Sequence, residues 1–296
     1  MTSIPTSAAK FDSAARSHIG HVRSRNEDSY LENADLGLWL VADGVGGNTH
    51  GDFASQVVTQ TVERKIKSGS TLKDAIVSAH LALIKLAREN LEMKGMASTV
   101  VAVKFEEARY QIAWVGDSRA YLITKNNAIR QLTKDHNQAQ FLVDTGELTI
   151  EEARTHPTQC VLMQAMGADD EGWHVDQVDG VFEQGDFLLL CSDGLTGDLQ
   201  EPELLESIKS GKLLSIIVDE LIDKALVKGG GDNITVALIS LNQGDAHSAS
   251  SLSGKNLEGN ECGLPDMTSV SLPTLKHLIW GSLMALIVVI MTMFVL

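Results

Sequence analysis

Four aspartates in this chain stand where an apolar, strand-like run of residues meets a short loop: Asp43, Asp117, Asp193 and Asp232. Glycines lie beside them, and a glycine lets the backbone approach a ligand closely. A single Asp-Gly pair is typical of a tight turn, but turns do not require aspartate, so the recurrence favours one shared site at the rim of a sheet. Clustered carboxylates without histidine or cysteine at metal-ligand spacing indicate a hard cation, Mn²⁺ or Mg²⁺ rather than Zn²⁺.

Two such cations suit the hydrolysis of a phosphate ester. They bridge and activate a water molecule and bind a phosphoryl oxygen, and an arginine then balances the charge on the equatorial oxygens. The charged segment 21–28 carries arginines for this role, although its composition is also typical of a solvated hairpin loop. A covalent route is not indicated, because Cys160 and Cys191 lack a loop of the Cys-x₅-Arg type and Ser118 has no evident base.

The composition limits the classes of protein that fit. The 296 residues, 44% of them hydrophobic, suit one sizeable domain with a core and additional segments. The formal net charge of −15 gives an acidic surface that repels phosphate backbones, so nucleic acid is not an expected partner. Three cysteines without metal-type spacing, at 160, 191 and 262, indicate a reducing compartment rather than a disulfide framework.

Apolar periodicity predicts the elements that position the four aspartates. Strand-like runs lie at 38–42, 98–104, 109–115, 119–124, 173–182, 187–191 and 234–241, and helical spacing lies at 52–67, 71–93, 202–209 and 213–228. We expect 98–104, 109–115 and 119–124 to form three consecutive antiparallel strands. Between 133 and 170 apolar residues become sparse, and we expect two short helices in an inserted, partly mobile flap at about 135–170.

The two ends of the chain differ from this central part. Residues 1–15 lack the apolar core of a signal peptide, so we expect a disordered N-terminus, a domain at 16–241 and no export. Residues 242–277 are rich in Ser, Gly and Asn, which predicts a flexible linker. Residues 278–296 are an uninterrupted apolar run whose helical length of ~28 Å matches the hydrocarbon core of a bilayer. We therefore expect a single-pass C-terminal membrane anchor with the catalytic domain on the cytoplasmic side.

Six short motifs occur in order along the chain. They are RSRNED at 23–28, VADGVGG at 41–47, VGDSRAY at 115–121, LTKDH at 132–136, LCSDGLT at 190–196 and GGDNITV at 230–236. Together they resemble the motifs of the metal-dependent protein phosphatases of type 2C (the PPM family), especially the compact bacterial serine/threonine members. The resemblance covers about residues 17–241, and the ordered set is far more specific than any one motif.

The resemblance implies an α+β fold, a four-layer α/β/β/α sandwich of two antiparallel sheets flanked by helices, to which this chain adds the predicted transmembrane helix. It implies hydrolysis of phosphoserine and phosphothreonine by a water activated by two metal ions, Mn²⁺ or Mg²⁺, with a weaker third ion in addition. Phosphorylated proteins are then the expected partners, among them a Ser/Thr kinase that this membrane-tethered phosphatase opposes and the substrates of that kinase.

The matching positions in the motifs imply roles for individual metal ligands. Asp43 would bridge two metal ions, and the carbonyl of Gly44 would bind the second of them. Asp193 and Asp232 would complete the coordination of the first ion. Asp117, together with Asp193, would hold the weaker third ion.

Three further residues match functional positions of the family. Arg23 matches the phosphate-binding arginine, which makes it a substrate-binding and catalytic candidate. Glu27 and Asp28 match ligands that act on the metal ions through water. The segment 146–152 and the following His-Pro pair resemble the bacterial flap that shapes substrate access.

The chain departs from the family pattern at two places. Some relatives carry a histidine after the Asp-Gly pair, proposed as the general acid, whereas this chain has Val45 there. His136 and His156 are the candidate proton donors, and a purely structural role for either stays open. Thr-Gln-Cys at 158–160 stands where bacterial relatives often have Arg or Asn, which affects contacts between flap and substrate rather than catalysis.

Three other functions fit parts of the pattern. A catalytically inactive relative that binds phosphorylated partners would have lost a core aspartate, whereas Asp43, Asp193 and Asp232 are all present. A metal-dependent nuclease also uses clustered carboxylates, but the acidic surface and the lack of a basic, aromatic-lined groove count against it. A Ca²⁺-stabilised adhesion sandwich would be exported, which the missing signal peptide disfavours.

Overall fold

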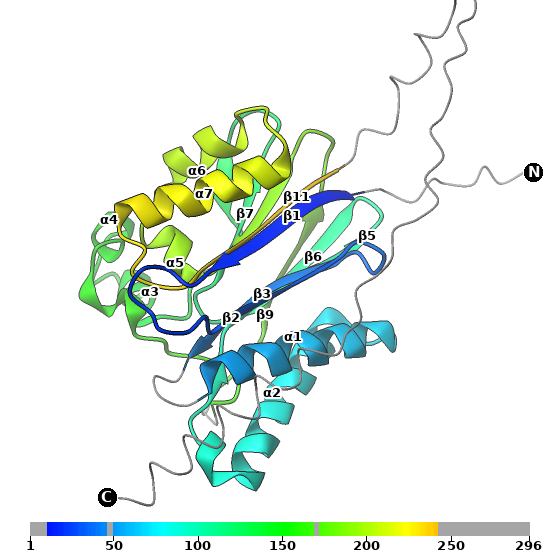
Figure 1. Ribbon diagram of the computed structural model, residues 1–296, viewed down its shortest axis with the longest axis vertical. Coiled ribbons are helices and arrows are strands. Elements are labelled where there is room, and N and C mark those ends of the chain that lie inside the picture. Colours follow the sequence, from blue (N-terminus) through cyan, green and yellow to red (C-terminus); the bar gives the residue numbers. More distant parts are fainter. Residues whose placement is uncertain (1–10, 46–49, 169–171, 242–296) are drawn as a thin grey trace, which may run out of the picture. The chain divides into compact units, whose positions relative to one another are not determined.

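Two antiparallel β-sheets lie face to face in the computed structural model, and helices cover the outer face of each sheet (Figure 1). The structure describes residues 11–45, 50–168 and 172–241. The predicted linker at 242–277 and the predicted membrane span at 278–296 lie outside the described residues. Within the described ranges, no helix is long and apolar enough to cross a bilayer.

The sheets contain five and six strands. The first has the order β1 (Phe11–His18), β11 (Ile234–Leu241), β10 (Phe187–Cys191), β7 (Arg119–Ile123) and β8 (Ile129–Gln131). The second has the order β2 (Asp28–Asn33), β3 (Leu38–Val45), β5 (Val100–Glu106), β6 (Arg109–Val115) and β9 (Asp176–Val181), with β4 (Ala97–Ser98) paired to β3 off this path. The predicted pair of antiparallel sheets is thereby confirmed.

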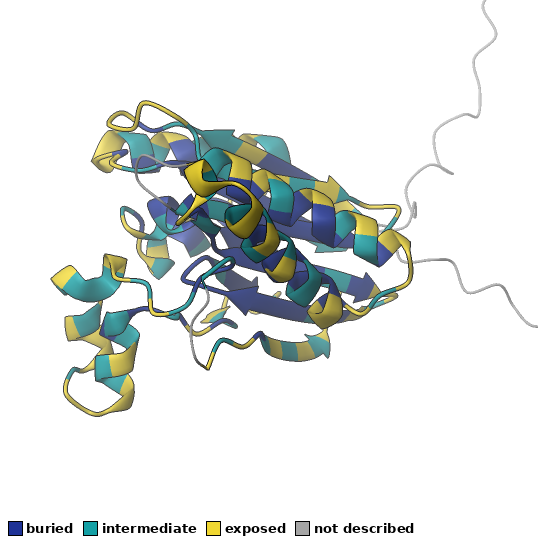
Figure 2. Cartoon of the chain, turned by 90° about the horizontal axis from the view of Figure 1, so that it is seen from below, coloured by how far each residue is buried: buried dark blue, intermediate teal, exposed yellow. Residues whose placement is uncertain are grey.

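The helices form the two outer layers. α1 (Gly51–Lys67) and α2 (Leu72–Glu89), followed by the 3₁₀ turn η1 (Leu91–Met93), cover the sheet of β3, while α6 (Glu201–Ile208) and α7 (Leu214–Lys228) cover the sheet of β11. The predicted flap holds α3 (Gln138–Asp144), α4 (Ile150–Ala153) and the 3₁₀ turn η2 (Pro157–Cys160), and α5 (Asp193–Thr196) follows β10. Figure 2 shows that α-helices of the outer layers have buried inner sides and exposed outer sides.

Strand β3 is buried on both of its faces, which explains its unbroken apolar sequence. Leu38, Leu40 and Ala42 belong to the core beneath α1 and α2. Trp39 and Val41 alternate with them and belong to the core between the two sheets. Because successive side chains of a strand point to opposite faces, one strand contributes to two cores. Such a strand is a rigid support for the residues at its end.

Three predictions of element position are corrected by the structure. Strand β1 begins at Phe11, inside the predicted disordered N-terminus, because Ala14 and Ala15 pair with β11 and are both buried. These small side chains carry a weak apolar signal. The segment 119–124 does not continue the sheet of β6: β7 pairs with β8 and β10 in the opposite sheet. Strand β9 begins at Asp176 rather than at 173.

Substitution of Trp39 tests how much the core between the sheets contributes to stability. Its ring is fully buried against Phe11 and Phe105, and its indole N–H has no hydrogen-bond partner in the described part of the chain. Trp39→Ala is expected to lower the free energy of unfolding by about 3–5 kcal/mol. Trp39→Phe should cost much less, since it keeps an aromatic ring and removes an unpaired donor.

Unfolding in guanidinium chloride, followed by circular dichroism, measures both effects. Leu91→Ala serves as the control, because Leu91 is 85% exposed and its truncation should change the free energy of unfolding by less than about 0.5 kcal/mol. Equal losses for the two Trp39 variants would contradict the packing described here.

Candidate functional site

The four aspartates singled out in the sequence line one cavity of about 160 Å³ at an edge of the sandwich. They come from both sheets: Asp43 lies near the end of β3, Asp117 follows β6, Asp193 follows β10 and Asp232 precedes β11. The complete lining is Arg23, Glu27, Asp43, Gly44, Val45, Asp117, Cys160, Leu162, Asp193, Asp232 and Asn233. The site was predicted at the rim of one sheet, and the structure places it at the common edge of two sheets.

Backbone pairing fixes the position of Asp43. It lies opposite Asp28 in the β2–β3 ladder. Its amide donates to Thr99 Oγ1 at 3.1 Å, and its carbonyl accepts from the amide of Thr99 at 2.7 Å. At the next position, a Cβ on Gly44 would lie 2.0 Å from the carbonyl oxygen of Gly51, so the close approach of α1 requires glycine there.

Asp117 is positioned by the loop that connects β6 in one sheet to β7 in the other. Gly116 has φ +106°, and a Cβ there would lie 2.7 Å from the side chain of Thr99. The loop is also held by His136, whose amide donates to the carbonyl of Gly116 and whose Nδ1 accepts from the amide of Gly116. A glycine at this position is thus what permits Asp117 to face the cavity.

Asn233 joins the loop of Asp232 to the N-terminal loop of the site. Its Oδ1 accepts from the amide of Glu27 at 2.8 Å, and its Nδ2 donates to the carbonyls of Ile19 at 2.8 Å and Arg25 at 3.0 Å. One buried amide side chain therefore positions the whole segment that carries Arg23 and Glu27. Asn233 belongs to the GGDNITV motif at 230–236, and no role was predicted for it from the sequence.

Arg23 forms an ion pair with Asp232, with Nη2 at 2.7 Å from Oδ2. The hydrogen bond to Asp232 raises the pKa of Arg23 above its ordinary value. The two side chains are 49% and 36% exposed, so solvent screens this contact and it can be exchanged for another at small cost. Arg23 thus reaches the cavity from its open side.

Asp28 lies behind the cavity rather than in its lining. Its Oδ2 accepts hydrogen bonds from Ser192 Oγ at 2.8 Å and Thr235 Oγ1 at 2.6 Å. Its Oδ1 is buried and has no hydrogen-bond partner among the residues that the structure describes, and the same is true of Asp193 Oδ1. Buried carboxylate oxygens without a partner are costly, which indicates that they serve a ligand.

Burial and mutual repulsion shift the acidity of these groups. Burial raises the pKa of Asp43 well above its ordinary value, and the charges of Asp28 and Asp193 raise it further. Burial, followed by the charge of Asp193, does the same to Asp117. The pKa of Asp193 is raised by burial and by the charge of Asp232, and burial raises the pKa of Asp28 to about 7.

The residues at this site fit divalent cations. Converging carboxylates that repel one another and two unpartnered buried oxygens match the preference of Mn²⁺ and Mg²⁺ for oxygen ligands. The lining also contains the thiol of Cys160, which donates a hydrogen bond to the carbonyl of Pro157. In the described part of the chain, the other cluster of potential ligands is His136, His174 and Asp176, which lies outside the cavity lining. There the Nδ1 of His136 already accepts from an amide, so its Nε2 carries the proton of the neutral ring and is not a free ligand.

The two candidate proton donors do not line the cavity. His136 has Nε2 3.3 Å from Asp176, and burial lowers its pKa. His156 accepts from the amide of Thr158 at the start of η2. Their role as proton donors stays a prediction. From the same part of the flap, Cys160 and Leu162 line the cavity, whereas residues 158–160 were expected only to affect contacts between flap and substrate.

The raised pKa values predict how stability depends on pH. Without cations, the folded protein binds more protons at Asp43, Asp117 and Asp193 than the unfolded chain does, so the free energy of unfolding falls as pH rises above about 4. Mn²⁺ requires deprotonated ligands and should bind more tightly at higher pH. At a 100-fold excess over Kd near pH 8, Mn²⁺ is expected to raise Tm by about 5–10 °C, and by clearly less near pH 5.

Differential scanning calorimetry with and without Mn²⁺ at both pH values measures this difference. A Tm shift that is equal at the two pH values, or larger in acid, would contradict the assignment of these carboxylates as the cation ligands.

Comparison with known proteins agrees with the fold. The family model described as protein phosphatase 2C matches residues 15–226. A serine/threonine phosphatase, stp, of Listeria innocua is 37% identical over 240 residues, which are 77% of this chain and 94% of the relative. The crystal structure of the Mycobacterium tuberculosis serine/threonine phosphatase PstP aligns with a TM-score of 0.71 at 33% identity, over 78% of this chain and 99% of that one.

A second solved structure bears on the cations. The catalytic domain of the serine threonine protein phosphatase PstP in complex with two manganese ions aligns with a TM-score of 0.70 at 31% identity, over 78% of this chain and 98% of that one. The family match covers more than half of the chain and includes Asp43, Asp117 and Asp193, while Asp232 follows its end. The chain belongs to the protein phosphatase 2C family of metal-dependent phosphatases.

Proposed function

We propose that this protein hydrolyses phosphoserine and phosphothreonine in other proteins, with Mn²⁺ or Mg²⁺ as cofactor. The observation that supports this most directly is the cavity in which carboxylates from both sheets meet beside one exposed arginine. Its small volume and its lining of charged side chains suit a phosphoryl group and two or three cations rather than a large apolar ligand.

The family motifs suggest which residues would hold the cations, and the position of these residues in the cavity lining supports this assignment. Asp43, the carbonyl of Gly44, Asp193 and Asp232 would hold the two ions, and Asp117 with Asp193 a third. When bound there, the cations would supply a water of lowered pKa and compensate the charge of the phosphoryl group. The protein itself contributes a rigid arrangement of oxygens, because both sheets and their connecting loops fix these side chains.

Arg23 would bind and orient the phosphate. Its guanidinium can offer two parallel N–H groups to phosphate oxygens. Because its ion pair with Asp232 is half exposed, the exchange of one anionic partner for another needs no change in the fold. Asn233 keeps the loop of Arg23 in place while this exchange occurs. Glu27 lines the cavity and Asp28 lies behind it, and both would act on the cations through water.

We further propose that the enzyme is tethered to a membrane by residues 278–296 and opposes a Ser/Thr kinase there. The support is the unbroken apolar sequence of that segment and the polar linker before it. A tether confines enzyme and membrane-bound substrates to one surface, which raises their effective concentration without new contacts.

Asp232→Asn tests the proposed chemistry. The substitution keeps the size of the side chain but removes a charged ligand, so Mn²⁺-dependent release of phosphate from a phosphothreonine peptide should fall by about 100-fold or more. Asp219→Asn is the matched control, because Asp219 lies on α7 facing Arg16 with a side chain 58% exposed and should leave the rate unchanged. A wild-type protein that is folded, binds Mn²⁺ and releases no phosphate would refute the proposed function.

Deletion of 278–296 tests the tether. The shortened protein is expected to move from the membrane pellet to the supernatant after ultracentrifugation of lysed cells, since the apolar segment is gone. A deletion of the same length within the linker, 250–268, should leave the protein in the pellet. Full-length protein in the supernatant would show that the segment is not an anchor.

A further inference from the structure

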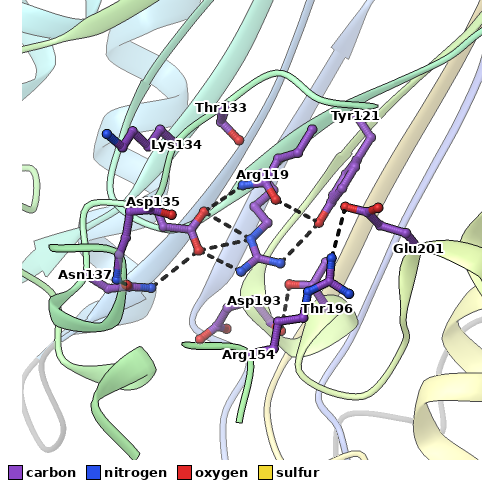
Figure 3. Close-up of polar contacts among 12 residues, drawn as sticks. Arg119, Tyr121, Thr133, Lys134, Asp135, Asn137, Arg154, Asp193, Thr196 and Glu201 are labelled. Carbon is purple, nitrogen blue, oxygen red and sulfur yellow. Dashed lines mark hydrogen bonds and ion pairs between the residues drawn. The ribbon is translucent and has the colours of Figure 1, made fainter. Parts of the chain in front are cut away.

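A second and larger cavity, of about 580 Å³, lies between the flap helices and the sheet of β7. It is lined by residues of α3 and α4 on one side and by Arg119 and Tyr121 of β7 on the other. Figure 3 shows its polar wall, with the guanidinium of Arg119 between Asp135 and the hydroxyl of Tyr121. This wall adjoins the site described above, because Arg119 follows Asp117 by two residues.

Each of the three guanidinium nitrogens of Arg119 takes part in a hydrogen bond. Its Nε lies 3.0 Å from both carboxylate oxygens of Asp135, its Nη2 lies 2.7 Å from Oδ2, and its Nη1 donates to the hydroxyl of Tyr121 at 3.1 Å. Asp135 also accepts from Gln131 Nε2 at 3.0 Å and from Asn137 Nδ2 at 3.4 Å. The side chains of Arg119 and Asp135 are 26% and 6% exposed, so water competes little for the pair.

The guanidinium also acts on the carboxylates of the cation site. Burial raises the pKa of Asp117 and Asp193, and the positive charge of Arg119 works in the opposite direction on both. The structure nevertheless gives Arg119 no hydrogen bond to either aspartate among the described residues; its carboxylate partner is Asp135. In Figure 3 no dashed line joins Asp193 to Arg119.

We propose that Asp135 is a positioning residue for the cation site, which holds the guanidinium of Arg119 away from Asp117 and Asp193. An arginine is a permanent cation with several donors, and it pairs with whichever carboxylate is best placed. With Asp135 present, two nitrogens of Arg119 are bonded to that carboxylate and the oxygens of Asp117 and Asp193 stay open to a divalent ion. Without Asp135, Arg119 would turn to those aspartates and compete with the ion. The inference rests on the proposed cation site.

This role predicts different effects on Mn²⁺ affinity for substitutions of the two partners. Asp135→Asn frees Arg119 and should weaken Mn²⁺ binding by about 10-fold, a size typical for residues that position metal ligands. Arg119→Met removes the competing cation and should leave Mn²⁺ affinity unchanged or tighter. The double variant has no arginine at position 119, so the loss of the Asp135 carboxylate releases no competing cation. Its affinity for Mn²⁺ should therefore lie within about twofold of that of Arg119→Met.

Isothermal titration calorimetry of the full chain with Mn²⁺ measures these affinities without reference to phosphatase activity. Asp144→Asn is the matched control: Asp144 lines the same cavity and pairs with Lys134 at 2.7 Å, yet lies on α3, and the affinity of this variant for Mn²⁺ should equal that of the wild type. Circular dichroism confirms that each variant is folded. If Asp135→Asn does not fold, the Mn²⁺ affinity of Arg119→Met alone tests the proposal. A 10-fold loss of affinity in that variant would overturn it.

The results separate this inference from the proposed function. Wild-type protein that binds no Mn²⁺ would refute both. Wild-type protein that binds Mn²⁺, together with an Asp135→Asn variant of unchanged affinity, would refute the positioning role alone. If the Arg119–Asp135 pair is purely structural, both single variants should bind Mn²⁺ more weakly than the wild type. The double variant should then show no recovery of Mn²⁺ affinity.

Discussion

Repulsion among buried carboxylates is the constraint on which the rest of this structure depends. Asp43, Asp117 and Asp193 come from three separate strand ends, and burial together with their own charges raises the pKa of each. No local sequence preference would bring mutually repelling carboxylates together, so the free energy that holds them in place comes from other parts of the structure. It comes from cores such as the one that buries both faces of β3, which make the strand ends stiff enough to bear the repulsion.

Neutral groups, rather than charges, carry out most of the positioning at the cavity. Asn233 fixes one loop with three hydrogen bonds, Thr99 holds the backbone of Asp43, and the hydroxyls of Ser192 and Thr235 hold Asp28. Amides and hydroxyls can orient a carboxylate without neutralising it. The negative charge is thereby left for divalent cations, which is what a metal-dependent phosphatase of the 2C family requires of its protein scaffold.

Much of the fold and of the site could be predicted from the sequence, and the features that could not be predicted have physical reasons. Apolar runs predicted most strands and the paired helices, and the recurrence of Asp beside Gly predicted which carboxylates meet. Sheet membership was not predictable for β7, because periodicity reports that a strand is buried but not which strand it pairs with. Ala14 and Ala15 were missed because small side chains give little apolar signal. Cys160 reaches the cavity through the fold of the flap, which no local pattern encodes.

Arg23 and Arg119 have the same guanidinium group but different surroundings, and the proposed roles of the two residues differ accordingly. Arg23 forms an ion pair with Asp232 with half of its side chain in solvent, which suits the proposed exchange of that partner for a phosphate. Arg119 is held on three nitrogens by Asp135 and Tyr121 and is largely enclosed, so it stays where it is. A free guanidinium beside these aspartates would take the place of a metal ion. The proposed functions require Arg23 to move and Arg119 to stay in place, and the two side chains differ accordingly in exposure and in the number of acceptors offered to each.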